Sequence, residues 1–229
     1  MDSQEANTLD RTIRVAGRGK ISVSPDTIRL PVTAEGTFPD YAETMKRSAE
    51  DTEAVRAALA AAGLDPKDLK TSHFGVNTVY ESVQDKDGEW KQRFAGYRYE
   101  HRMTIRFPLD NEVLGRVLAQ LAQCPAAATF SVEHTVKDPE KVRTKLLKQA
   151  VADSRKKAET LTRAAGVKLG EVVRIDYAWG ADEIAARPMN AMMRSKAMVM
   201  EEALGSFDMA MEAEDIDVED TVTVIWTIL

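Results

Sequence analysis

The chain has 229 residues, 44% of them hydrophobic and 30% charged, which is typical of a folded protein and excludes wholesale disorder. Its formal net charge of −6 is poorly suited to a broad surface that binds nucleic acid. Cys124 is the only cysteine, so no disulfide can form within the chain, and no apolar run approaches the roughly 20 residues of a membrane-spanning helix.

The first residues are polar and acidic, and we expect 1–11 to form a flexible tail. They lack the basic, apolar and small-residue order of a signal peptide. The sequence therefore predicts a soluble cytoplasmic protein, or an exported one if a signal peptide has been removed from it.

Alternating apolar residues predict two strands after this tail. Residues of one parity are apolar in each: Ile13, Val15, Ile21 and Val23 in the first, and Ile28, Leu30, Val32 and Ala34 in the second. Pro31 has no N–H for a sheet, so we expect the second strand to lie at an edge or to be interrupted there.

The period then changes to that of an amphipathic helix over Asp40–Ala62, ended by Gly63 and Pro66. Its predicted apolar stripe is Tyr41, Met45, Ala49, Thr52, Val55 and Leu59. Alternation returns at 74–80 and 97–107, and the polar turn between them, centred on Asp87-Gly88, predicts a hairpin.

The second half repeats this mixture. Asp110 caps a short helix that carries Leu114 to Leu121, and a strand follows over 130–136. Asp138-Pro139 begins a helix over 138–165, whose predicted stripe is Val142, Leu146, Ala150, Ala158, Leu161 and Ala165. Strands at 172–175 and 216–228 complete the chain. The order ββαββ-αβαββ predicts an α+β fold with mainly antiparallel sheets, helices on one face and two interlocked lobes within one domain, 12–229.

Residues 181–213 break this pattern and are rich in methionine. They contain Met189, Met192, Met193, Met198, Met200, Met209 and Met211. Thioethers adapt to apolar partner surfaces, are open to oxidation and suit copper(I). We rank a subunit contact first, a lid or disordered loop second and copper third, and expect a mobile arm that a second copy orders.

Five segments together resemble the SIMPL-domain family, named for a signalling molecule that associates with a pelle-like kinase. They are Ile13–Asp26, Ala62–Leu64 with Asp68–Ser72, Gly96–Arg98, Ala150–Val173, and the methionine-rich loop before the last strand. The resemblance implies a two-lobed α+β fold, a tendency to self-assemble and an association with oxidative-stress tolerance. It implies no established catalytic residues.

Other candidate sites have simpler interpretations. Gly17-Arg-Gly19 lacks the third glycine and the following helix of a dinucleotide fingerprint, so close backbone packing is favoured. His101 and His134 lie on apolar strand faces, and no third ligand with metal-site spacing accompanies them. Cys124 is interpreted as a small buried apolar residue.

The helix over 138–165 is basic, but the acidic total and the lack of interleaved aromatic residues favour a solvated face. No P-loop, G-x-S-x-G or H-E-x-x-H motif is present. We therefore predict a non-catalytic, self-assembling interaction protein with no cofactor and no metal. The alternatives are an enzyme with a cleft between the lobes and a weak nucleic-acid binder through the basic helix.

Overall fold

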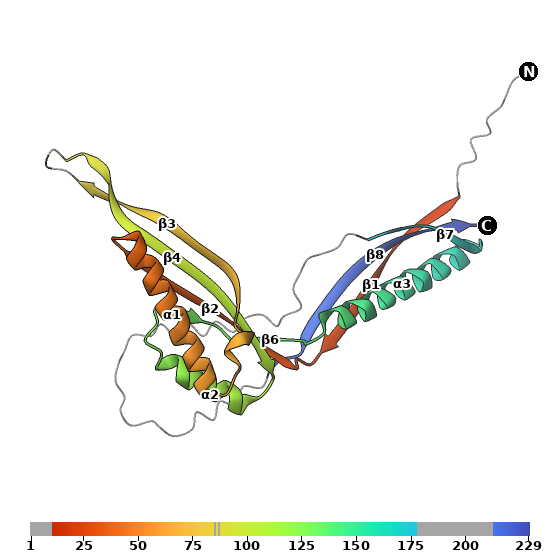
Figure 1. The fold of residues 1–229 in the computed structure, drawn as a ribbon. Helices are drawn as coiled ribbons and strands as arrows, with labels where there is room; N and C mark the ends of the chain where they lie inside the picture. The colour runs from red at the N-terminus through yellow and green to blue at the C-terminus, as the bar shows by residue number, and fades with distance from the viewer. Residues whose placement is uncertain (1–10, 85, 87, 178–212) are drawn as a thin grey trace, which may run out of the picture. The chain divides into compact units, whose positions relative to one another are not determined.

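The computed structural model describes residues 11–84, 86, 88–177 and 213–229 (Figure 1). The chain divides into two compact units. Of the described residues, the terminal unit comprises 11–24, 136–177 and 215–229, and the central unit comprises 25–84, 86, 88–135 and 213–214. The chain thus leaves the terminal unit after its first strand and returns to it for its last elements.

The terminal unit is a three-stranded antiparallel sheet with one long helix on it. Its elements are β1 (Thr12–Val23), α3 (Pro139–Ala164), β7 (Leu169–Asp176) and β8 (Ile216–Ile228). The strand order is β1-β8-β7, and α3 runs along β1 and β8 (Figure 1). Asp138 caps α3 by accepting a hydrogen bond from the Lys141 N–H at 3.0 Å, as the sequence predicts.

The core of this unit is small, because α3 lies very close to β1. The buried cluster is Val15, Ala150, Ala158, Val222, Val224 and Trp226. A Cβ at Gly17 would lie 1.9 Å from the Ala150 carbonyl oxygen, and one at Gly19 would lie 2.3 Å from that of Leu146. Only glycine fits at either position, so the expectation of close backbone packing is confirmed.

The central unit is a five-stranded antiparallel sheet with two helices on one face (Figure 1). Its elements are β2 (Thr27–Phe38), α1 (Tyr41–Ala61), the 3-10 helix η1 (Pro66–Asp68), β3 (Lys70–Gln84), β4 (Trp90–Pro108), α2 (Asn111–Ala122), β5 (Ala128–Phe130) and β6 (Glu133–Thr135). The strand order is β3-β4-β2-β5, and β6 also pairs with β2. The predicted strand over 130–136 is therefore two short strands.

Pro31 explains that division. β2 is not an edge strand, because β4 pairs with all of it on one side, while on the other side β6 pairs with Thr27–Arg29 and β5 pairs with Val32–Ala34. Pro31 falls between the parts of β2 that β5 and β6 cover, where its carbonyl accepts from the Ser131 N–H at 3.2 Å. The edge alternative is wrong, and the interruption falls in the partner strands.

In both long helices, the face that is buried differs from the predicted apolar stripe over part of the helix. On α1 the buried residues are Thr44, Ser48, Thr52, Val55, Ala58 and Leu59, whereas Tyr41, Met45 and Ala49 are exposed. On α3 the buried row is Leu146, Ala150, Ser154, Ala158 and Thr162, whereas Leu161 is 53% exposed. Small polar residues point inward because the facing sheet leaves no room for larger ones: aromatic rings fill the space beside α1, and β1 itself lies close to α3. The α+β class and the antiparallel sheets are confirmed.

Candidate functional site

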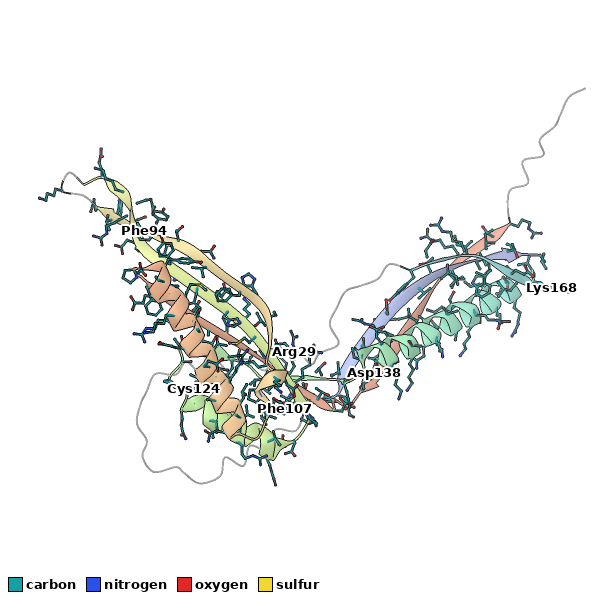
Figure 2. The ribbon with its side chains drawn as sticks, in the orientation of Figure 1. Arg29, Phe94, Phe107, Cys124, Asp138 and Lys168 are labelled. Carbon is teal, nitrogen blue, oxygen red and sulfur yellow. The ribbon has the colours of Figure 1, made fainter. Side chains whose placement is uncertain are left out.

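The hairpin of β3 and β4 extends beyond the start of α1 and carries aromatic side chains that no described helix covers (Figures 1 and 2). Tyr80 lies directly opposite Phe94, and Gln84 lies opposite Trp90. The register shifts between Val79 and Tyr80, which brings Phe94 onto the same face as Tyr97. Because side chains alternate along a strand, Trp90 shares that face with Phe94.

These rings form a connected row. The ring centroids of Tyr41 and Tyr97 are 5.4 Å apart, those of Tyr97 and Phe94 are 5.3 Å apart, and those of Phe94 and Tyr80 are 5.9 Å apart. All three pairs meet edge to face, which is a favourable geometry for aromatic rings. Tyr41, Tyr80, Trp90, Phe94 and Tyr97 define the hairpin aromatic surface.

Much of this surface faces solvent. Trp90 is 71% exposed, Tyr80 57%, Tyr41 51% and Phe94 44%. Single exposed apolar residues are ordinary, but a contiguous apolar patch on a folded protein marks an interaction surface. Tyrosine, tryptophan and phenylalanine are also the residues enriched where proteins meet.

The same hairpin presents a long sheet edge. Among the described strands, β3 pairs with β4 alone along its 15 residues. Lys70 and Glu81 are its only charged residues, and it contains no proline. Natural edge strands are usually short or are blocked by charge, proline or a covering element, so β3 is open to pairing with another strand.

Behind the aromatic row, a hydrogen-bonded chain ties α1 to the sheet. The nitrogens of His101 lie 2.9 Å from the Thr52 hydroxyl and 2.8 Å from the Thr71 hydroxyl. Thr52 donates to the Ser48 carbonyl at 2.7 Å, so we assign the His101 proton to Nδ1, where it is donated to Thr52. Burial, with a smaller contribution from Arg56, lowers the pKa of His101, which favours the neutral ring.

The remaining histidines and Cys124 form no common site. His134 is partly buried with a pKa lowered by burial, and its Nε2 has no hydrogen-bond partner among the described residues. Cys124 is half-buried against the core of the central unit. Among the described residues, no group of three or more potential ligands is placed to hold a metal ion. That these histidines bind no metal stays a prediction.

Helix α3 carries internal ion pairs rather than a uniform basic face. Arg155 pairs with Glu159 at 3.0 Å, and Lys157 pairs with Asp153 at 2.7 Å. Both pairs join residues four apart on an exposed helix, a common arrangement in solvated helices. The methionine-rich segment, 181–213, lies outside the described residues except for Ala213, so the structure leaves its seven methionines unplaced.

The sequence argument missed the hairpin aromatic surface. It assigned Tyr41 to a buried stripe and did not consider Trp90 and Phe94. A signal was present, because Tyr80 and Phe94 lie on opposite sides of the turn predicted at Asp87-Gly88 and at similar distances from it, so a hairpin brings them close together.

These features define an α+β protein of two antiparallel units with an exposed aromatic hairpin. The chain belongs to the SIMPL family, described as a protein of unknown function (DUF541), whose profile matches residues 13–226. It is 28% identical over 172 residues to the 26 kDa periplasmic immunogenic protein of Brucella melitensis biotype 1, covering 75% of this chain and 68% of that protein. The same identity and coverage hold for the protein of that name from Brucella abortus.

A third relative is the uncharacterized protein YggE of Edwardsiella ictaluri, 27% identical over 164 residues, which covers 71% of this chain and 66% of that protein. The prediction of a cytoplasmic location is wrong in the light of the two relatives named as periplasmic. The single cysteine does not distinguish the two compartments, because a protein can fold in the periplasm without a disulfide. The polar first segment does not distinguish them either. Within the described residues, no helix is long and apolar enough to cross a membrane.

Proposed function

We propose that the chain is a non-catalytic, self-assembling interaction protein whose subunits meet through the hairpin aromatic surface. The observation that carries this proposal is the row of exposed rings on the part of the hairpin beyond α1. Leaving Trp90 and Tyr80 in water forgoes the free energy that a buried aromatic side chain supplies. A partner surface that covers them recovers that free energy.

A second copy of this chain is the partner we favour. The open edge of β3 allows two copies to pair antiparallel about a twofold axis, each supplying the same strand. Such pairing would extend each five-stranded sheet across the axis. The rings of Tyr80 and Phe94 would then lie beside the new junction, where they can be buried.

Our proposals on location and physiological role are supported by the relatives and the family resemblance, and not by the hairpin. Two relatives are named as periplasmic, and we propose that this chain is exported as well. A role in oxidative-stress tolerance rests on the family resemblance and on the methionines of 181–213, which can be oxidised reversibly. The arm that we expect in that segment would add a second subunit contact.

Light scattering over a range of concentrations tests the assembly. The variant carrying Tyr80→Ser, Trp90→Ser and Phe94→Ser should lose assembled mass, while Leu161→Ser, which changes an equally exposed residue on α3, should keep it. Circular dichroism establishes that both variants are folded. A parent chain that is monomeric at high concentration, or a triple variant with the parent's mass, contradicts the proposal.

Replacing 181–213 with a short glycine-rich linker separates the two contacts. If both operate, this deletion and the triple hairpin variant each lower the assembled mass in part, and their combination lowers it further. An unchanged mass after the deletion removes the arm from the proposal and leaves the hairpin.

A further inference from the structure

Helix α3 of the terminal unit has an apolar surface pocket on the flank away from β1. Its lining residues are Leu147, Lys148, Val151, Ala152 and Arg155. Asp153 and Lys157 lie on the opposite flank of the helix, where they bond to main-chain groups of β1. Leu147 and Val151 are partly buried against the cluster that contains Trp226 of β8. Because the strand order is β1-β8-β7, the pocket faces the side of the helix on which β7 lies.

Strand β7 continues this apolar surface on the sheet. Val172 lies opposite Trp226 and Ile175 lies opposite Val224, so both side chains point to the face of the sheet that α3 covers. They are nevertheless 44% and 52% exposed, because α3 runs along β1 and β8. Since α3 is the only described helix of this unit, that face of β7 is left largely uncovered among the described elements.

The pocket and the end of β7 lie side by side because the chain turns back after α3. Strand β7 begins within a few residues of the end of α3 and runs back beside it (Figure 1). The hydrogen bond to Asp220 raises the pKa of Tyr177, just after β7, and the nearby charge of Arg143 partly opposes this effect. Leu147 follows Arg143 by about one helical turn, so the pocket is level with the end of β7.

The uncovered place has the dimensions of one helix. Neighbouring strands lie about 4.8 Å apart, so β7 is about 10 Å from β1 across the sheet. Helices that pack together lie about 8–10 Å apart. A helix packed on this flank of α3 would therefore lie over β7. The central unit fills the corresponding place with a helix of its own, because α1 and α2 pack together on one face of its sheet.

The charges beside this place favour an acidic occupant. The pocket lining contains Lys148 and Arg155 and no carboxylate. Arg155 pairs with Glu159 at 3.0 Å, whereas Lys148 has no ion-pair partner among the described residues. Lys141 has none among them either, and it lies about two helical turns before Lys148 on the same side of the helix. Two ammonium groups thus lie along the flank that a second helix would face.

We propose that the terminal unit binds an acidic amphipathic helix of a partner protein, which packs beside α3 and over β7. Its apolar stripe would cover Val172 and Ile175 of the strand together with the apolar side chains of the pocket, as in other complexes in which a helix lies in a groove. Carboxylates beside that stripe would meet the two lysines of α3, just as charged pairs flank the apolar seam between two packed helices.

Fluorescence anisotropy of the full chain with a labelled helical peptide tests the proposal. The probe has about 20 residues, because shorter isolated helices are marginal in water. It carries leucine on one face and glutamate on the others, and its counterpart carries lysine in place of glutamate. The glutamate peptide should bind, and the lysine peptide should bind about tenfold or more weakly.

Single substitutions then locate the peptide. Lys148→Glu should weaken binding of the glutamate peptide about fivefold or more and strengthen that of the lysine peptide. Val172→Ser, at an exposed position, should weaken binding of both. The matched control is Lys156→Glu, on α3 but outside the pocket, which should bind both peptides like the parent. Circular dichroism establishes that each variant is folded.

Four results would overturn the proposal. The first is a parent chain that binds neither peptide, or that binds both as Lys148→Glu does. The second is binding lost in the triple hairpin variant but kept in Lys148→Glu, which would place the peptide on the hairpin aromatic surface. The third is an assembled mass that falls in Lys148→Glu without peptide, which would identify a contact between copies of this chain. The fourth is binding that appears only when 181–213 are replaced by the linker, which would assign the place to that segment.

Discussion

The two units differ in how closely a long helix approaches its sheet. In the terminal unit both faces are small where they meet: the sheet is reduced to glycine at Gly17 and Gly19, and most of the buried row of α3 is Ala150, Ser154, Ala158 and Thr162. In the central unit the sheet contributes Tyr99, His101 and Met103, and the N-terminal half of α1 is reduced to Thr44, Ser48 and Thr52. Close packing is reached in the terminal unit by main-chain approach, and in the central unit by large side chains of the sheet that fill the space beside a small helix face.

Their sheet edges differ as well. Helix α3 bonds to main-chain groups of the edge strand β1: the Arg18 N–H donates to Asp153 at 2.8 Å, and Lys157 donates to the Ala16 carbonyl at 3.2 Å. Among the described elements, β3 of the central unit has only β4 as a partner. One unit therefore covers an edge with its own helix, and the other leaves its longest edge for a partner.

The largest effect is expected where the sheet is reduced to glycine. Gly17→Val places a Cβ against main-chain atoms of Ala150 and Ser154, which cannot move aside without shifting α3. We expect a loss of more than about 3 kcal/mol, or an unfolded α3. Hydrogen exchange should show lost protection in α3 and β1 while α1 and β4 keep theirs.

The control for this substitution is Ala16→Val, on the neighbouring exposed position of β1. It should change the free energy of unfolding by less than about 0.5 kcal/mol. A Gly17→Val variant as stable as this control would mean that α3 does not approach β1 as closely as the glycines imply.

The buried row of α3 is tested next. Leu146 is 2% exposed, so Leu146→Ala should cost about 2–5 kcal/mol. Leu161→Ala, at an exposed position of the same helix, should cost less than about 0.5 kcal/mol. Urea denaturation of both variants gives the comparison, and equal costs would restore the predicted stripe that contained both leucines.

The local patterns predicted the elements well and their contacts less well. Alternation over Ile13–Val23 and the Asp138-Pro139 signal depend on neighbouring residues, so the strand and the helix start were predictable. The inward face of α1 depends on Tyr99 and His101, which are distant in sequence, and an apolar stripe alone could not place it. The hairpin aromatic surface is similar, because Tyr41 and Tyr97 become neighbours only through the packing of α1 on the sheet.

A smaller effect is expected from the hydrogen-bonded chain behind α1. Thr52→Val keeps the side-chain shape but removes the hydroxyl that accepts from His101, leaving a buried N–H without that partner. We expect a cost of about 1–3 kcal/mol. Thr160→Val, at an exposed position of α3 where the hydroxyl bonds only to its own helix, is the control and should be nearly neutral. Equal urea midpoints for the two variants would show that the chain adds no stability.

The least disruptive test uses pH, because all three histidines lie in the central unit. Burial lowers the pKa of His101 and of His134 below their ordinary value of 6.5. Between that value and the lowered pKa, the unfolded chain binds more protons than the folded one, so stability falls as the pH falls below 6.5. In the terminal unit, Lys157 and the Arg18 N–H lower the pKa of Asp153 below 3.8. The stability that Asp153 contributes is therefore present above pH 3.8 and is lost only as the pH falls through the lowered pKa.

Hydrogen exchange at pH 7.5 and pH 5 should therefore show the central unit weakening more than the terminal unit. Replacing His101 and His134 with glutamine should reduce that difference, whereas His73→Gln, at an exposed position, should not. A central unit equally stable at both pH values would contradict the neutral state of the buried His101 and the partly buried His134.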